Sequence, residues 1–324
     1  MGFPKPWPTP WPDPEPDPPT EPTEPTARND LAFHAVTWAV NHACNLRCTH
    51  CYDVVEDRRH DLSTTDALSV VDRLGEAGVD FVAFSGGELF LRKDLFSLIE
   101  RCVERGIAFG ARSNGTRVTQ EIAARLASLG AAVVGVSFDG ATSSVHDATR
   151  GAGAFEAAVR GVEALVAAGV RTQIEVVLSR ANSAQAVEFI QLGDDVGAAE
   201  VNFSAMTPIG RGAQRTEDLL DRSLWTGLVQ RLREASVHAP MRVTPNCAFA
   251  GDCAANVEPH ITCEGWMTPC YLSTERLFHV LETPPSDFGA LLARSRPRYL
   301  DVCGRAQWQQ DRPPARLVQL SRRG

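Results

Sequence analysis

The feature that most constrains the fold is a regular alternation of short apolar segments and amphipathic segments from residue 31 to residue 236. Six apolar segments have the length of buried strands, and each is followed by apolar residues at helical spacing. The first helical segment, residues 63–78, opens with Ser63 and Asp66 as a capping box. Six βα units in succession predict a parallel sheet covered by helices. The strands are expected within residues 31–40, 79–88, 107–115, 131–140, 171–179 and 199–208.

Unusual residues follow the ends of successive predicted strands. A doubly wound sheet and a β/α barrel both fit six units, and periodicity alone does not separate them. The chemically distinctive groups lie at residues 44–51, 85–88, 113–115 and 137–140. In a β/α barrel these strand ends share one face, which is where such folds place their chemistry. We therefore predict an α/β fold, a partial (β/α)6 TIM-type barrel spanning residues 30–238.

The segments on either side of this alternation differ from it. In residues 1–29 proline recurs at almost every second position, so this tail is expected to be extended or disordered and to bury no core. Residues 239–324 are short of regular patterns and rich in cysteine and turn residues. They predict a small, metal-stabilised auxiliary domain.

Charge and composition exclude several classes of protein. The net charge of −8 disfavours a non-specific nucleic-acid binder, which needs a basic surface. The sequence contains no run of 18 apolar residues that could span a membrane, and its N-terminus does not resemble a secretory signal. We therefore expect a cytoplasmic protein. Nine cysteines, an odd number with three in one short loop, indicate metal or redox chemistry and not a disulfide framework.

The three clustered cysteines are Cys44, Cys48 and Cys51, spaced C-x3-C-x2-C. A structural zinc site needs four protein ligands, so this loop is one ligand short. A cubane 4Fe–4S cluster has four irons, and three thiolates leave the fourth iron open to another ligand. The spacing therefore favours a cluster whose open iron takes part in the chemistry.

This loop resembles that of the radical S-adenosylmethionine (radical SAM) superfamily, which has an aromatic residue before the last cysteine; here that position is His50. The family also has a Gly-Gly-Glu segment after the second strand, matched by Gly86, Gly87 and Glu88. Leu89 stands where the family often has proline.

The resemblance implies a 4Fe–4S cluster that binds S-adenosylmethionine and receives an electron from an external donor of the flavodoxin or ferredoxin type. Reductive cleavage then gives a 5′-deoxyadenosyl radical that abstracts hydrogen from a substrate. The resemblance further implies that Gly86, Gly87 and Glu88 orient the methionyl end. Four more residues match positions at which relatives contact S-adenosylmethionine: Asn114, Ser137, Asp139 and Arg150.

A second cysteine group follows the predicted barrel. The segment from Cys253 to Cys270 reads C-x11-G-x4-C, with Gly265 as its glycine, and is similar to the opening of SPASM and twitch auxiliary-cluster extensions. The resemblance implies at most one auxiliary Fe–S cluster, held by Cys253, Cys270 and Cys303 together with Cys247 or Cys263. The same thiolates suit tetrahedral zinc, which is the alternative. Cys102, within an apolar helical pattern, is expected to be a core residue.

These features predict a radical SAM enzyme that modifies a peptide or natural product. A peptide maturase of this kind would need a separate peptide-recognition protein, and a small-molecule enzyme would not. Two alternative hypotheses remain. The first is a non-catalytic zinc-binding or regulatory protein, and the second is a radical SAM enzyme that acts on nucleic acid, which the negative net charge disfavours. Arg211 and Arg215, after the sixth strand, are expected near the cavity mouth, either holding an anionic substrate group or solvated.

Overall fold

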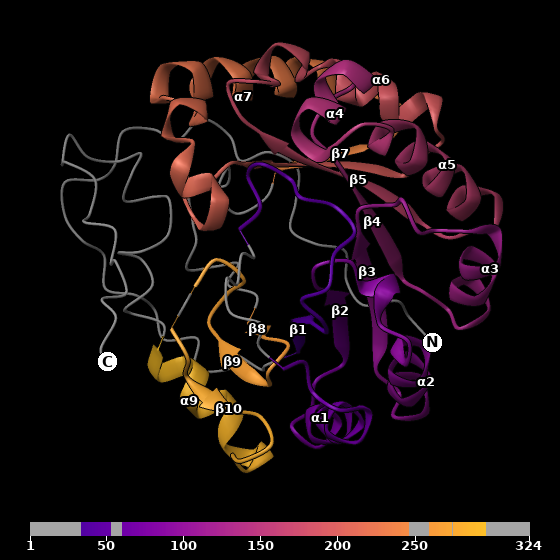
Figure 1. The fold of residues 1–324 in the computed structure, drawn as a ribbon, viewed down its shortest axis with the longest axis vertical. Coiled ribbons are helices and arrows are strands. Elements are labelled where there is room, and N and C mark those ends of the chain that lie inside the picture. The colour runs from indigo at the N-terminus through magenta and orange to yellow at the C-terminus, as the bar shows by residue number, and fades with distance from the viewer. Residues whose placement is uncertain (1–33, 53–59, 246–258, 274, 296–324) are drawn as a thin grey trace.

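The computed structural model describes residues 34–52, 60–245, 259–273 and 275–295. Within them the chain forms one curved sheet with the strand order β10-β9-β8-β1-β2-β3-β4-β5-β6-β7. The order is open at both ends, and the helices cover the outer face of the sheet (Figure 1). This arrangement confirms the predicted partial β/α barrel.

Seven strands form the parallel part of the barrel in chain order. Each pairs with its successor along the sheet, so the carboxyl ends of all seven lie at the same edge. Their bounds are β1 (Ala35–Ala39), β2 (Phe81–Ser85), β3 (Ala108–Ser113), β4 (Val133–Phe138), β5 (Thr172–Leu178), β6 (Glu200–Ala205) and β7 (Arg242–Pro245).

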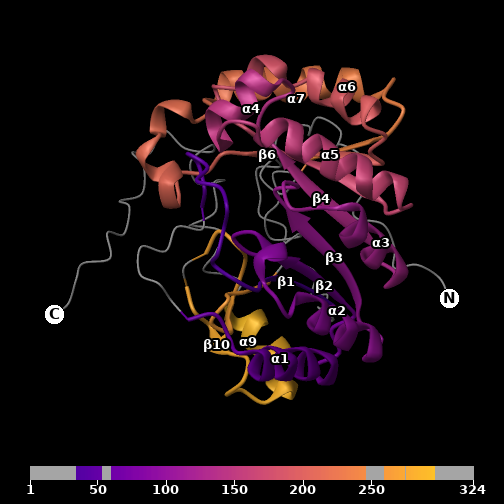
Figure 2. The same cartoon turned by 45° about the vertical axis from the view of Figure 1, so that its right-hand side comes forward.

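The helices follow the strands and pack on the outside of the sheet, as the rotated view makes clear (Figure 2). Ser63 caps the first of them, accepting a hydrogen bond from the Asp66 backbone N–H, as the capping box predicts. Their bounds are α1 (Thr64–Glu76), α2 (Leu95–Glu104), α3 (Gln120–Ser128), α4 (Ser143–Arg150), α5 (Ala154–Ala167), α6 (Glu188–Asp195), α7 (Arg222–Ser236) and α9 (Phe288–Ser295).

One apolar core joins the sheet and its helices. Trp38 and Phe84, on the paired strands β1 and β2, are fully buried and lie with ring centroids 5.9 Å apart. Cys102 on α2 is fully buried in the same core, which confirms its predicted role, and burial raises the pKa of its thiol to about 12. None of the described helices has the length and hydropathy needed to span a membrane.

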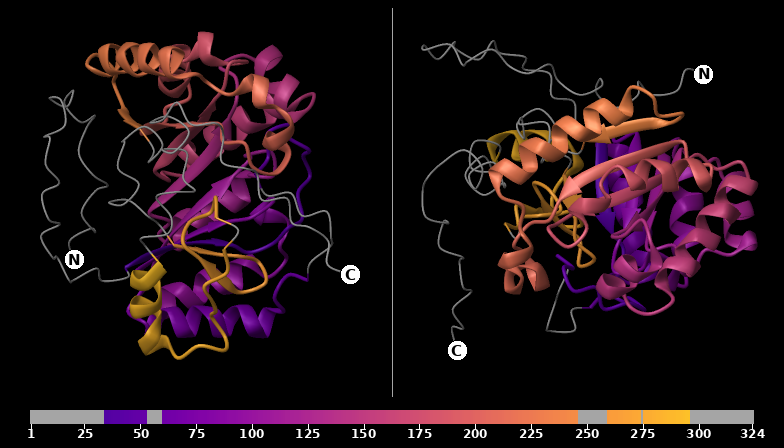
Figure 3. Two further views of the ribbon diagram at one scale, coloured as in Figure 1. Left: turned by 90° about the vertical axis from the view of Figure 1, so that its left-hand side faces the viewer. Right: turned by 90° about the horizontal axis from the view of Figure 1, so that it is seen from above.

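The described C-terminal residues extend the barrel sheet. Strand β8 (His260–Ile261) pairs in parallel with β1, and β9 (Trp266–Thr268) and β10 (Phe278–His279) follow antiparallel to it. These strands and α9 lie together beside β1 and α1 (Figure 3). Strand β7, also C-terminal to residue 238, pairs with β6. Residues on both sides of the predicted boundary at 238/239 thus contribute strands to one sheet, and the boundary itself stays a prediction.

Candidate active site

The cysteine loop begins directly after β1 and lies across the carboxyl end of β2. The Val40 N–H donates to Ser85 O (2.9 Å), and the Glu88 N–H donates to Ala43 O (2.7 Å). The side-chain amide of Asn41 donates to Glu88 O (2.9 Å). The Gly-Gly-Glu segment after β2 is thus hydrogen-bonded to the residues that lead into Cys44.

The two glycines allow this close approach. A Cβ on Gly87 would lie 2.5 Å from His42 O and 2.6 Å from Ala43 O, and one on Gly86 would lie 2.7 Å from Asn41 O. Real Cβ atoms essentially never come within 3.0 Å of such atoms. The structural requirement for Gly86 and Gly87 is therefore contact with the backbone of residues 41–43.

Glu88 points away from the cavity beside these glycines. Its carboxylate accepts hydrogen bonds from the Ser113 hydroxyl (2.9 Å), the Asn114 N–H (2.9 Å) and the Phe90 N–H (3.2 Å). Burial raises the pKa of Glu88, and these hydrogen bonds oppose that rise. Because the carboxylate is 1% exposed and bonded to the end of β3, Glu88 joins two strand ends.

Asn114, at the end of β3, contacts the cysteine loop from a second side. Its side-chain amide donates to Asn45 Oδ1 (3.0 Å) and lies 4.0 Å from Cys44 Sγ. Asn45 in turn donates to the Thr116 hydroxyl (2.8 Å). The first cysteine of the loop is therefore positioned by the segments that follow β2 and β3.

A buried charged group after β4 supports the other end of the loop. Asp139 Oδ2 lies 2.9 Å from His50 Nε2 and 2.5 Å from Arg150 Nε, and the Thr49 N–H donates to Thr149 O (3.0 Å). Burial alone would raise the pKa of Asp139, but the charges of Arg150 and His50 outweigh it and hold that pKa below its usual range. The sequence indicated Asp139 and Arg150 but not the pairing of Asp139 with His50.

All three loop cysteines line one cavity of about 620 Å³ at the carboxyl ends of the strands, which we call the central cavity. Cys48 is buried, and burial raises its pKa, with the charges of Arg150 and Arg211 opposing the rise. Burial also raises the pKa of Cys44. Since metals bind thiolates, these thiols must lose protons when a metal binds.

The structure brings most of the predicted cofactor-binding residues to this cavity. Five of the seven line it: Gly86, Gly87, Asn114, Ser137 and Arg150. Glu88 and Asp139 lie behind its wall and bond to groups that line it. The predicted ligands Cys247, Cys253 and Cys303, and the N-terminal tail, lie outside the described residues.

The cavity also has polar lining residues that the sequence analysis missed. Arg112 on β3 and Glu175 on β5 lie 3.7 Å apart, across Gly135 on the strand between them. A Cβ on Gly135 would lie 2.9 Å from the Glu175 carboxylate, so this glycine makes room for the pair. Strand β5 alternates buried residues with half-buried ones, and Glu175 is one of the half-buried residues. This alternation could have indicated that Glu175 faces the cavity. Strand positions facing a cavity therefore carry polar side chains at a period of two.

The C-terminal strands bring two further cysteines close to the cavity. Tyr271, which follows Cys270, lines the cavity and meets Tyr52, which follows Cys51, edge-on with ring centroids 5.4 Å apart. Cys263 lies in the connection between β8 and β9, and its carbonyl accepts a hydrogen bond from the Leu62 N–H (2.9 Å). The loop and the C-terminal segment are thus in direct contact.

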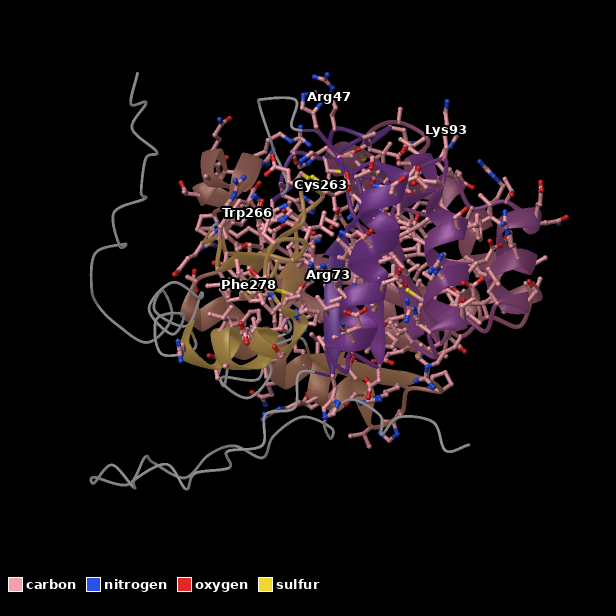
Figure 4. All side chains as sticks on the ribbon, turned by 90° about the horizontal axis from the view of Figure 1, so that it is seen from below. Arg47, Arg73, Lys93, Cys263, Trp266 and Phe278 are labelled. Carbon is pink, nitrogen blue, oxygen red and sulfur yellow. The ribbon has the colours of Figure 1, made fainter. Side chains whose placement is uncertain are left out.

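Cys263 forms a second group of potential ligands with His42 and Asp61 (Figure 4 labels Cys263). Their ligand atoms lie within 4.8 Å of one another, but Cys263 Sγ is only 2.5 Å from His42 Nε2. The Cys263 thiol and the His42 imidazole are therefore in direct contact.

The loop cysteines differ from such a compact group. Among the residues that the structure describes, Cys44, Cys48 and Cys51 do not form a set with all sulfurs within 4.8 Å. Three thiolates on a single zinc ion would be roughly 3.8 Å apart. A wider spacing suits a multi-iron cluster, in which each of three irons takes one thiolate.

Comparison with known proteins is in agreement with this geometry. Residues 38–192 match the family described as the Radical SAM superfamily. Mycofactocin maturase MftC of Mycobacterium ulcerans is 39% identical over 186 residues, covering 57% of this chain and 50% of that protein. The AdoMet-dependent heme synthase of Oleidesulfovibrio alaskensis is 33% identical over 186 residues, covering 56% and 48%. The chain spans about half the length of these curated relatives.

Solved structures share the fold at low sequence identity. Streptococcus suis SuiB bound to S-adenosylmethionine aligns with a TM-score of 0.70 and 16% identity, covering 85% of this chain and 68% of SuiB. SuiB bound to its precursor peptide SuiA aligns with a TM-score of 0.69 and 15% identity, covering 80% and 65%. At such identities the likeness establishes the partial barrel and nothing about substrate.

Proposed function

The chain carries a radical SAM domain in residues 38–192, and we propose that it is an enzyme that cleaves S-adenosylmethionine reductively and abstracts hydrogen from a peptide. The observation that carries this proposal is the central cavity, which Cys44, Cys48 and Cys51 line together with Gly86 and Gly87 of the segment after β2. Three cysteines that line one cavity suit a cluster with one iron left for a small ligand.

Within this proposal the chain's own residues bind and orient the cofactors. Cys44, Cys48 and Cys51 hold a 4Fe–4S cluster through their thiolates. When bound, the reduced cluster supplies the electron that breaks a carbon–sulfur bond of S-adenosylmethionine and releases a 5′-deoxyadenosyl radical. An external donor of the flavodoxin or ferredoxin type supplies that electron.

The residues around the cavity assign the two ends of S-adenosylmethionine. Gly86 and Gly87 line the cavity next to Ser85, whose hydroxyl is buried without a partner among the described residues. This surface suits the methionyl amine. Arg150 lines the cavity while bonded to Asp139, and its guanidinium suits the methionyl carboxylate. Asn114 and Ser137 remain for the ribose.

A peptide is the substrate class we propose. MftC is named as a maturase and SuiB binds a precursor peptide, and both resemble this chain. The likeness to a heme synthase supports a second candidate, a precursor of a cofactor. As a peptide maturase, the protein would act with a separate peptide-recognition protein.

We further propose one auxiliary Fe–S cluster. The contact of Cys263 with His42 supports leaving Cys263 out of its ligand set, which then comprises Cys247, Cys253, Cys270 and Cys303. Iron and sulfide counts after anaerobic reconstitution test this assignment. Cys263→Ala is expected to keep the wild-type iron content, and Cys270→Ala to lose the iron of one cluster. Equal iron loss in both variants would refute the assignment, and zinc in place of iron would refute the auxiliary cluster.

The substrate proposal is tested by 5′-deoxyadenosine formation. The reconstituted, reduced protein is given S-adenosylmethionine and either a peptide fraction or a small-molecule fraction of host extract. We expect the peptide fraction to stimulate 5′-deoxyadenosine formation. Stimulation by the small-molecule fraction alone would overturn the peptide proposal in favour of a cofactor precursor.

A further inference from the structure

Arg211 lies after β6 in a short helical turn (Gly210–Gln214) and contacts the cysteine loop. Its backbone N–H donates to Cys51 O (2.9 Å), and its Nε–H donates to Cys48 O (2.8 Å). These two carbonyls belong to the first and last residues of the turn Cys48–Cys51, in which the Cys51 N–H also points to Cys48 O (3.4 Å). One residue therefore fixes both ends of the turn that carries two of the three loop thiols.

The glycines on either side of Arg211 make this contact possible. Gly210 has φ +57°, and a Cβ there would overlap Cys51 O and lie 2.5 Å from Tyr52 O. A Cβ on Gly212 would lie 2.8 Å from Thr207 O. A larger residue at Gly210 would push this segment off the loop, and one at Gly212 would overlap the chain that leads into the segment.

Arg211 also differs from Arg150 in how its charge is balanced. Arg150 is bonded to the buried carboxylate of Asp139, which offsets its charge near Cys48. Arg211 donates to neutral carbonyls, and within the described part of the chain no carboxylate forms an ion pair with it. A positive charge of this kind favours added negative charge at the thiols.

We propose that Arg211 is a positioning residue that holds the Cys48–Cys51 turn and, through its charge, raises the reduction potential of the cluster on the three loop thiols. This inference rests on the proposed function. Reduction adds one electron to the cluster, and cluster potentials depend on the net charge and hydrogen bonding around the ligands. Arg211 thus contacts the cysteine turn through its backbone N–H and its Nε–H, a contact that the sequence analysis did not predict.

The test uses the full chain with reconstituted clusters and compares Arg211→Gln, Arg211→Lys and Arg215→Gln. Arg215 lies in the same segment and pairs with Asp218, so it serves as the matched control. The midpoint potential is measured by titration monitored with electron paramagnetic resonance. The loop cluster is identified as the signal that changes when S-adenosylmethionine is added.

We expect a more negative potential in Arg211→Gln, which removes the charge, and near wild-type potentials in Arg211→Lys and Arg215→Gln. Iron release to a chelator should be several-fold faster in Arg211→Gln than in Arg215→Gln. An unchanged potential in Arg211→Gln, or an equal shift in Arg211→Lys, would overturn the proposal. If Arg211→Gln binds no iron, Arg211→Lys is compared with wild type alone: a near wild-type potential is expected, and a clearly more negative one would overturn the proposal.

The two proposals fail in distinguishable ways. A wild-type protein without any signal that responds to S-adenosylmethionine refutes the proposed function. A normal wild-type signal with unchanged Arg211 variants refutes only the role of Arg211.

Discussion

The substitution Gly87→Ala tests whether the Gly-Gly-Glu segment positions the cysteine loop through close backbone contact. The new Cβ would lie 2.5 Å from His42 O and 2.6 Å from Ala43 O, and ordinary contact begins at 3.4 Å. The backbone of residues 42–43 must therefore retreat by about 0.9 Å, the difference between 3.4 and 2.5 Å. That displacement also weakens the hydrogen bonds from Gly87 N to Asn41 O and from Glu88 N to Ala43 O.

Overpacking of this kind costs about 1–3 kcal/mol of the free energy of unfolding. For a protein of 324 residues a loss of about 2 kcal/mol lowers Tm by roughly 3 °C. Thermal unfolding of the cluster-free protein, followed by circular dichroism, measures the loss. Because the shifted backbone leads into Cys44, the iron bound after reconstitution should fall as well.

The matched control is Gly227→Ala on the exposed face of α7, where a Cβ meets no atom within 4 Å. Replacing this helical glycine should leave iron content unchanged and stabilise the protein by up to about 1 kcal/mol. The reasoning is refuted if Gly87→Ala retains both the wild-type Tm and the wild-type iron content.

Three further predictions concern buried groups near the loop and in the core. Asp139→Asn leaves Arg150 buried without its counter-charge, and urea unfolding should show a loss of about 3–5 kcal/mol; a loss below about 1 kcal/mol would contradict the pairing. Burial, together with the charge of Arg150, lowers the pKa of His146 from 6.5 to about 4. Between pH 4 and pH 6.5 the unfolded chain therefore binds a proton at His146 that the folded chain does not. The free energy of unfolding should therefore fall, by up to about 3 kcal/mol, as pH drops from 6.5 to 4, and this fall should be smaller in His146→Gln. Cys102 should resist alkylation in the folded protein and react in urea, as mass spectrometry would show, and Cys102→Ala should bind as much iron as wild type.

The sequence predicted those parts of the fold that are encoded locally. Strands β1 to β6 and their helices follow from apolar periodicity, and the Ser63 cap follows from a three-residue pattern. Helix α4 was missed because only His146 and Arg150 of its eight residues are buried, so it has no apolar stripe. The pairing of β8 with β1 joins segments more than 200 residues apart, and no local pattern encodes it.

The sequence predicted which residues belong to the candidate site, but it predicted few of the contacts between them. The spacing of the cysteines indicated the ligand set, and parallel strands brought Asn114, Ser137 and Arg150 to one cavity. The direction of a side chain depends on its neighbours in space. Glu88 turns to the end of β3 because Ser113 and Asn114 offer donors there. Arg211 reaches Cys48 O across 163 positions of sequence.

The central claim is that the loop cysteines support reductive cleavage of S-adenosylmethionine. The most direct measurement is 5′-deoxyadenosine formed by the reconstituted protein with S-adenosylmethionine and dithionite, without substrate, in wild type and in Cys44→Ala. We predict slow formation in wild type and none in Cys44→Ala, which should also lose the iron of one cluster. If wild type forms no 5′-deoxyadenosine and Cys44→Ala retains all of its metal, the account is contradicted.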